Sequence, residues 1–141
     1  MKDSGKAPEN GNYDLIVVGA GSAGFSASIT AAEAGKRVAL VGHGTIGGTC
    51  VNVGCVPSKA MIRAAEAVHA ATAADRFPGI VPCTPSVDWS ALVAGTTDLV
   101  DEMREKKYIS LLPQYEGVTY IEDGPAQLVA GGVQVGGRTL T

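Results

Sequence analysis

A glycine-rich turn constrains the fold of this chain more than any other feature: residues 19–24 read Gly-Ala-Gly-Ser-Ala-Gly, the pattern G-x-G-x-x-G. A short apolar run, 13–18, comes before the turn and predicts a buried parallel strand. After the turn, the alanine-rich segment 22–34 predicts a helix that ends at Gly35. A second apolar run, 37–41, predicts another buried strand. This order makes one βαβ unit with a right-handed crossover, so the sequence predicts an α/β fold around a parallel sheet.

In this setting the glycine turn predicts a dinucleotide site. Its glycines allow a tight turn, a close approach of backbone to pyrophosphate, and close packing of helix on strand. The start of the helix supplies free N–H groups and a partial positive charge for phosphates. One element is missing, because Gly42 and His43 follow the second strand where such sites carry an Asp or Glu for the adenosine ribose. We therefore expect weaker adenine-nucleotide binding than the motif alone predicts. The alternative is a glycine-rich turn without a ligand.

The segment 47–59 reads GGTCVNVGCVPSK and contains two of the three cysteines of the chain, Cys50 and Cys55. A thiol near a helix N-terminus feels the positive end of the helix dipole, which favours the thiolate and lowers the thiol pKa. Lys59 follows one turn later. These residues predict a redox-active pair, and the alternative is two ordinary buried thiols. Cys83 lies in a proline-rich stretch and is predicted to be a bystander.

The rest of the chain predicts helices and short strands within one domain, 13–141, after a polar tail, 1–12. An apolar face predicts a helix over 57–74, and three prolines predict a loop over 77–85. A further helix is predicted over 90–112. Short apolar runs joined by glycine turns then predict strands over 118–122, 126–130 and 133–135.

Composition excludes several classes of partner. The formal net charge of −3 gives no reason to expect a nucleic acid or an anionic membrane surface as partner. The polar tail lacks the apolar core of a signal peptide, and the glycine and serine content of 15–32 argues against a membrane-spanning helix. We therefore expect a cytoplasmic protein. In a reducing compartment, three cysteines indicate catalysis or metal binding before structural bridging.

Taken together, the glycine turn and the later GGTC-x4-C-x-PSK segment resemble the FAD-dependent pyridine nucleotide-disulfide oxidoreductases. The resemblance runs from Tyr13 to the last residue. Within that family it is tighter to the mercury(II)-reducing subfamily, through the segments 44–46, 61–65, 102–104 and 107–108. It implies a Rossmann-like FAD-binding domain with helices on both faces of a parallel sheet. A small antiparallel strand set would follow, and the domain would be incomplete at its carboxyl end.

The resemblance also implies roles for individual residues. Cys55 would be the charge-transfer thiolate against the flavin, Cys50 the interchange thiol facing substrate, and Lys59 a charge near the reactive flavin nitrogen. In the family, a hydride passes from NADPH to FAD, and electrons then pass to the cysteine pair. In the mercury-reducing subfamily they reduce Hg(II), which soft thiolates bind well, so Cys50 and Cys55 would also be metal ligands. The positions that match FAD contacts are Gly19, Gly21, Gly24, Gly44, Gly48, Thr49, Lys59 and Ala126.

Three readings of function remain open. The first is the FAD-binding, redox-disulfide portion of a mercury-detoxifying reductase that is a homodimer at full length. An NADPH-binding domain, a return segment and a dimerisation domain would follow in such an enzyme, so this chain is expected to be about its first third and inactive alone. The second is the same portion of dihydrolipoyl dehydrogenase. The third is a non-catalytic fragment that binds nucleotide or metal.

Overall fold

The computed structural model describes residues 12–141, and these residues form two compact units. Residues 12–48 and Arg104–Thr141 make the first unit, and Thr49–Met103 make the second. The polar tail predicted over 1–12 lies outside the described residues, except for Asn12.

A parallel sheet forms the centre of the first unit. Its strands are β1 (Leu15–Val18), β2 (Val38–Val41) and β3 (Val118–Ile121), and β2 lies between the other two. The helix α1 (Ser22–Glu33) connects β1 to β2. All four residues of β2 are buried, which explains why this strand is apolar throughout and does not alternate. The predicted βαβ unit and parallel sheet are confirmed.

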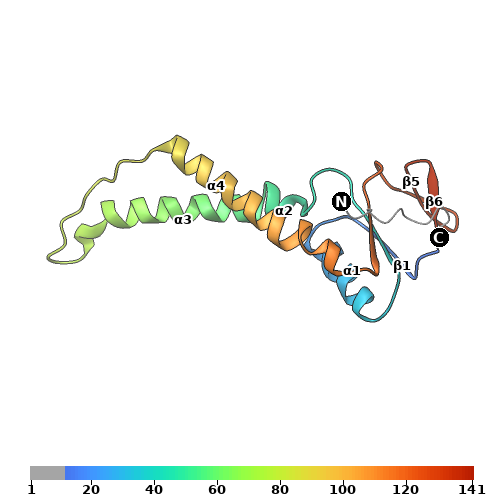
Figure 1. Cartoon of the computed structure of the whole chain (residues 1–141). Helices are drawn as coiled ribbons and strands as arrows, with labels where there is room; N and C mark the ends of the chain where they lie inside the picture. The colour runs from blue at the N-terminus through green and yellow to red at the C-terminus, as the bar shows by residue number, and fades with distance from the viewer. Residues whose placement is uncertain (1–11) are drawn as a thin grey trace. The chain divides into compact units, whose positions relative to one another are not determined.

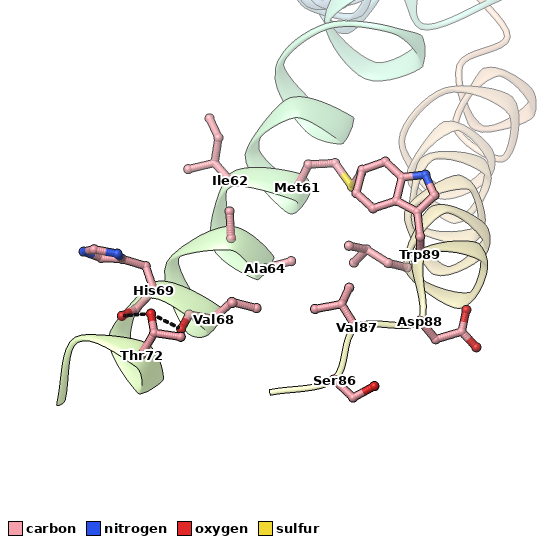
Figure 2. A pocket seen from close by; sticks show the side chains of 12 residues that line it. Met61, Ile62, Ala64, Val68, His69, Thr72, Ser86, Val87, Asp88 and Trp89 are labelled. Carbon is pink, nitrogen blue, oxygen red and sulfur yellow. Dashed lines mark hydrogen bonds between the residues drawn. The ribbon is translucent and has the colours of Figure 1, made fainter. Parts of the chain in front are cut away.

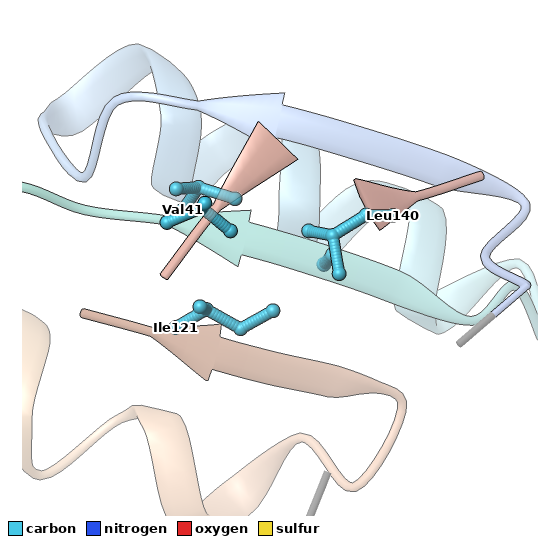
Figure 3. Close-up of a cluster of buried hydrophobic side chains, with 5 residues drawn as sticks. Val41, Ile121 and Leu140 are labelled. Atoms are coloured by element: carbon cyan, nitrogen blue, oxygen red, sulfur yellow. The ribbon is translucent and has the colours of Figure 1, made fainter. Parts of the chain in front are cut away.

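The two faces of the parallel sheet are covered by different kinds of structure. On one face, Leu40 lies with Phe25 and Ile29 of α1 around a small cavity. On the other face, Val41 and Ile121 belong to one buried apolar cluster with residues of a second, antiparallel sheet (Figure 3). That face therefore carries strands, and the expectation of helices on both faces does not hold for the described residues.

The antiparallel sheet consists of β4 (Gln127–Val129), β5 (Gly132–Val135) and β6 (Arg138–Leu140). The first two of these strands were predicted, and β6 was not. Val133, Val135 and Leu140 supply the buried side chains of this sheet, at 6%, 1% and 3% exposure. An ion pair between Arg138 and Asp123 joins β6 to the segment that follows β3.

The second unit is largely a pair of helices. The short helix α2 (Gly48–Asn52) leads to α3 (Cys55–Thr72), and a connection with the 3-10 turn η1 (Ala74–Arg76) returns the chain to α4 (Trp89–Arg104). Figure 1 shows α3 and α4 side by side. The helix predicted from residue 57 begins two residues earlier, and α2 was not predicted. Instead of continuing to 112, α4 gives way to the π-helix η2 (Glu105–Ile109) and the 3-10 turn η3 (Leu112–Gln114).

An open apolar groove of about 830 Å³ lies between α3 and the start of α4. Met61 and Val68 line it from α3, while Val87 and Trp89 line it from the opposite side (Figure 2). A hydrogen bond from Thr96 Oγ1 to Met61 Sδ, 3.5 Å long, links the two helices. In the part of the chain from 12 onward, no helix has both the length and the hydropathy required to cross a membrane.

Candidate functional site

A cavity of about 250 Å³ opens at the carboxyl ends of β1 and β2, where ligands of open parallel sheets bind. Both strand ends and the segment after each of them contribute to its wall. The predicted cofactor positions that line it are Gly19, Gly21, Gly44, Gly48 and Ala126. The fold therefore brings together residues that are more than a hundred positions apart in the sequence.

Local contacts fix the shape of this cavity. The N–H of Gly19 donates to the Val41 carbonyl at 2.8 Å, which ties the turn to the end of β2. The N–H of Gly47 donates to the Ala20 carbonyl at 2.9 Å and holds the segment after β2 against the turn. Because these contacts involve backbone atoms, the glycine walls of the cavity are held without help from side chains.

Gly24 serves packing and does not line the cavity. A Cβ built on it would overlap the Gly19 carbonyl oxygen and would lie 3.3 Å from Val17 Cγ1. Only a residue without a side chain lets the first turn of α1 lie this close to β1. This is the helix–strand packing role that the third glycine of the motif is expected to have.

The cavity suits an anionic group. Gly21 is the N-cap of α1 and has no side chain, so it leaves the start of this twelve-residue helix without a side-chain cap. The lining contains no Asp or Glu. The Ser22 hydroxyl is engaged elsewhere, in a 2.8 Å hydrogen bond with the Tyr108 hydroxyl. Tyr108 in turn packs edge-on against Phe25, with ring centroids 4.8 Å apart. The glycine turn and the start of α1 therefore fit the pyrophosphate of a dinucleotide, with backbone N–H groups as its ligands.

The cysteine pair lies in the second unit, where α2 meets α3. Cys50 is in α2 and Cys55 is the first residue of α3. Gly54 permits the close approach between them, because a Cβ on Gly54 would lie 2.8 Å from the Thr49 carbonyl oxygen and 3.1 Å from Cys50 Cα. The Cys55 side chain is close enough to the Cys50 thiol to affect its pKa. All three cysteines of the chain are free and exposed.

The neighbouring Cys55 shifts the pKa of the Cys50 thiol. The hydrogen bond with Cys55 is the main cause that raises the pKa of the Cys50 thiol, and the nearby positive charge of Lys59 opposes the shift. The prediction of a lowered pKa is therefore wrong for Cys50. The physical reason is that Cys50 lies inside the short helix α2 with the Cys55 side chain beside it.

The remaining predicted residues are Lys59, Thr49 and Cys83, and the first two lie close to the cysteine pair in the sequence. Lys59 lies one turn beyond Cys55 on α3, and Thr49 precedes Cys50 directly; both are exposed. Cys83 is far from the pair, because its N–H donates to the Ala71 carbonyl at 3.1 Å. Ala71 lies sixteen residues after Cys55 along α3, or about 24 Å at the helical rise. Among residues 12–141, no cluster of three or more His, Cys, Asp or Glu side chains could hold a metal ion.

Sequence reasoning missed Tyr120 of β3. Its hydroxyl is buried and lies against Gly42, the residue that stands where a ribose-binding acid was expected. The available signal was the unexplained glycine itself, since a missing side chain leaves volume that some other group has to fill.

Comparisons with known proteins agree with the fold. The profile of the pyridine nucleotide-disulphide oxidoreductase family matches residues 13–141. A mercuric reductase of Streptomyces lividans is 48% identical over 123 residues, covering 84% of this chain and 26% of that protein. For a mercuric reductase of Staphylococcus aureus the identity is 42% over 132 residues, covering 94% of this chain and 24% of that protein. The chain thus spans about a quarter of these relatives, less than the third expected from its sequence.

A similar solved structure is the HOCl-induced flavoprotein disulfide reductase RclA from Escherichia coli. The TM-score is 0.70 at 24% sequence identity, over 91% of this chain and 26% of that chain. At this identity the likeness concerns the fold, which is the Rossmann-like fold of flavoprotein disulfide reductases.

Proposed function

The chain belongs to the pyridine nucleotide-disulphide oxidoreductase family, and from this premise we propose that it is the FAD-binding, redox-dithiol portion of an NADPH-dependent mercuric reductase. Such an enzyme reduces Hg(II) to Hg(0). One observation carries the FAD part of this proposal: the family's cofactor positions Gly19, Gly21, Gly44, Gly48 and Ala126 line one cavity beside an uncapped helix N-terminus. The names and identities of the relatives support mercury as the substrate.

The residues of this chain would contribute binding and thiol chemistry. Backbone N–H groups at the start of α1 would hold the pyrophosphate of FAD, with the glycine walls allowing its close approach. When bound, FAD supplies a two-electron relay between NADPH and a disulfide. Reduction of a Cys50–Cys55 disulfide takes two electrons and two protons and gives the dithiol. The dithiol then binds Hg(II) through both sulfurs and releases its protons.

The cysteines have unequal roles in this proposal. The neighbouring Cys55 raises the pKa of Cys50, which disfavours the thiolate form of Cys50. The family resemblance assigns Cys55 as the charge-transfer thiolate and Cys50 as the interchange thiol, and a protonated Cys50 is compatible with that assignment. Lys59 would stabilise negative charge at the site. We further propose a cytoplasmic, homodimeric full-length protein, in keeping with the family resemblance.

A chimera tests the proposed function directly. This chain would replace the matching segment of the Streptomyces lividans mercuric reductase, with which it shares 48% identity. We expect the chimera to hold FAD and to oxidise NADPH in the presence of Hg(II). Cys50→Ser or Cys55→Ser should abolish that oxidation, whereas the matched variant Cys83→Ser should retain it. A folded, FAD-containing chimera that oxidises NADPH no faster with Hg(II) than its Cys50→Ser variant would refute the proposal.

Mercury binding by the chain itself gives a second test. The reduced chain should bind one equivalent of Hg(II) in competition with a small thiol, and metal analysis after gel filtration measures the amount. The double variant Cys50→Ser/Cys55→Ser should lose this binding, and Cys83→Ser should keep it. Equal binding by the double variant would show that another group is the ligand.

A further inference from the structure

Tyr108 connects the π-helix η2 to the first turn of α1. Its hydroxyl forms a 2.8 Å hydrogen bond with the hydroxyl of Ser22, the first residue of α1. Its ring packs edge-on against Phe25, with the ring centroids 4.8 Å apart and the planes at 89°. Ser22 and Phe25 are three residues apart, so they lie on the same face of the helix. A single side chain therefore holds the first turn of α1 at two points.

A π-turn sets Tyr108 in this place. The N–H of Ser110 donates to the Glu105 carbonyl at 2.9 Å, a bond that spans five residues, and the Ser110 hydroxyl donates to the Glu105 carboxylate at 2.8 Å. Turns of this kind are rare and are frequently found at functional sites. Tyr108 lies inside the π-turn and is 5% exposed. It also belongs to the segment 107–108, which resembles the mercury-reducing subfamily and to which the proposed function assigns no role.

The hydroxyl of Tyr108 adds something that the apolar packing of this segment does not supply. Leu111 and Leu112 lie with Phe25 and Ile29 of α1 around the small cavity on this face of the sheet. Such apolar contacts are non-directional, whereas a hydrogen bond has a preferred distance and angle. A phenylalanine at position 108 would keep the apolar contacts and lose the directional one. The bond to α1 can therefore be removed without removing the packing.

The end of α1 that Tyr108 holds is the end that faces the proposed cofactor. Gly21 precedes Ser22, lines the cavity at the strand ends and is the N-cap of α1. The N–H of Phe25 donates to the Gly21 carbonyl at 2.9 Å, so a shift of the first turn also shifts Gly21. Backbone groups at a helix start bind a pyrophosphate well only when neighbouring contacts hold them in the productive position.

From these contacts we infer that Tyr108 is a positioning residue for the dinucleotide: through Ser22 it holds the start of α1 in place for the pyrophosphate. The inference rests on the proposed function, in which the cavity at the glycine turn binds FAD. Neither Tyr108 nor the Ser22 side chain lines that cavity, so the two hydroxyls act on the ligand through the backbone of the first helical turn. Losing either hydroxyl should therefore weaken binding to the same extent.

Calorimetry with ADP, which carries the diphosphate half of the cofactor, tests this role on the 141-residue chain. Tyr108→Phe should weaken ADP binding about three- to tenfold, the range of one neutral hydrogen bond. Ser22→Ala changes an exposed residue and should weaken binding by the same factor, and the double variant should be no weaker than either single one. Ser22→Thr retains a hydroxyl and should retain the affinity of the parent. The matched control Tyr115→Phe, which changes another tyrosine beside α1, should also bind like the parent.

A destabilised control separates affinity from stability. Val100→Ala removes buried apolar volume from α4 in the second unit, so it should lower the stability of the chain and leave ADP binding unchanged. ADP affinity within about twofold of the parent in Ser22→Ala would overturn the inference while leaving the cofactor site in place. Losses that add in the double variant would overturn it as well, because the two hydroxyls would then act separately. Failure of the parent chain to bind either ADP or FAD would overturn the proposed site and this inference with it.

Discussion

At the scale of single residues, the Cys50 thiol differs from an isolated cysteine because a second thiol is within hydrogen-bond reach. That contact raises the pKa of Cys50. It exists because Gly54 lets the chain fold back over Thr49 and Cys50. The reactivity of one side chain is therefore set by a neighbour five positions away and by a glycine between them.

Removing Cys55 should make Cys50 more reactive. Cys55→Ala eliminates both the hydrogen bond and the second sulfur, so the pKa of Cys50 should fall toward its ordinary value. The pH dependence of alkylation by iodoacetamide measures this, with peptide mass spectrometry in a Cys83→Ser background. The midpoint for Cys50 should move to lower pH, and Val56→Ala should leave it in place. A midpoint that stays or rises would contradict the role assigned to Cys55.

A side chain at position 42 should destabilise the fold. In Gly42→Ala the new methyl group meets the Tyr120 ring, and overpacking of this kind costs about 1–3 kcal/mol. Urea unfolding measures the cost. In a Tyr120→Val background the same substitution should cost much less, because the ring that it meets is gone. The matched control is Gly95→Ala in α4, where a Cβ has open space; it should stabilise by up to about 1 kcal/mol. An equal cost in both backgrounds would rule out the clash.

At the scale of elements, α3 and α4 form a pair with few buried side chains. No residue of α3 is buried, and Val100 is the buried residue of α4. Val100→Ala should therefore lower the free energy of unfolding by about 2 kcal/mol, from lost burial and the cavity left behind. Val93→Ala, at a position 41% exposed on the same helix, should change it by less than about 0.5 kcal/mol. Urea titration compares the two, and equal effects would show that Val100 does not anchor α4.

Local patterns predicted the elements whose signals are local. The apolar runs of β1 and β2 and the alanine-rich α1 lie between glycines that end them, so their order and type follow from the sequence. The short α2 and the three-residue β6 carry too few residues for a periodic signal. Local patterns also could not predict that strands cover the second face of the parallel sheet, because the packing of Leu140 against Val41 depends on tertiary structure.

In the candidate site, too, some features follow from local sequence patterns and others depend on tertiary contacts. The glycine turn and the cysteine pair could be recognised from spacing, because each lies within a short segment. The contact of Tyr120 with Gly42 joins residues 78 positions apart on neighbouring strands, so no local pattern indicates it. The raised pKa of Cys50 likewise depends on its contact with Cys55, which the fold of the chain through Gly54 creates.

At the scale of the whole molecule, apolar side chains remain accessible on both units. In the first unit, β1 pairs with β2 alone among the described strands, and its Val18 is 56% exposed. In the second, Trp89 is 64% exposed beside the apolar groove. We expect the isolated chain to bind a hydrophobic dye and to associate as its concentration rises. Light scattering over a concentration series measures this, and a monomer at all concentrations without dye binding would contradict it.

The isolated chain should bind ligands without catalysing turnover. In the region from 12 to 141 a cavity opens at the carboxyl ends of β1 and β2, and in the proposed function FAD occupies it. Reduction of Hg(II) by NADPH also requires a site for the hydride donor, and the chain spans only 26% of the Streptomyces lividans relative. We therefore expect substoichiometric flavin and one equivalent of bound Hg(II), but no steady NADPH oxidation when mercury is added. Absorbance of NADPH measures the rate, with the chimera as positive control. Steady turnover by the isolated chain would contradict this expectation. It would mean that FAD and NADPH use the same cavity, or that a second site within these residues binds NADPH.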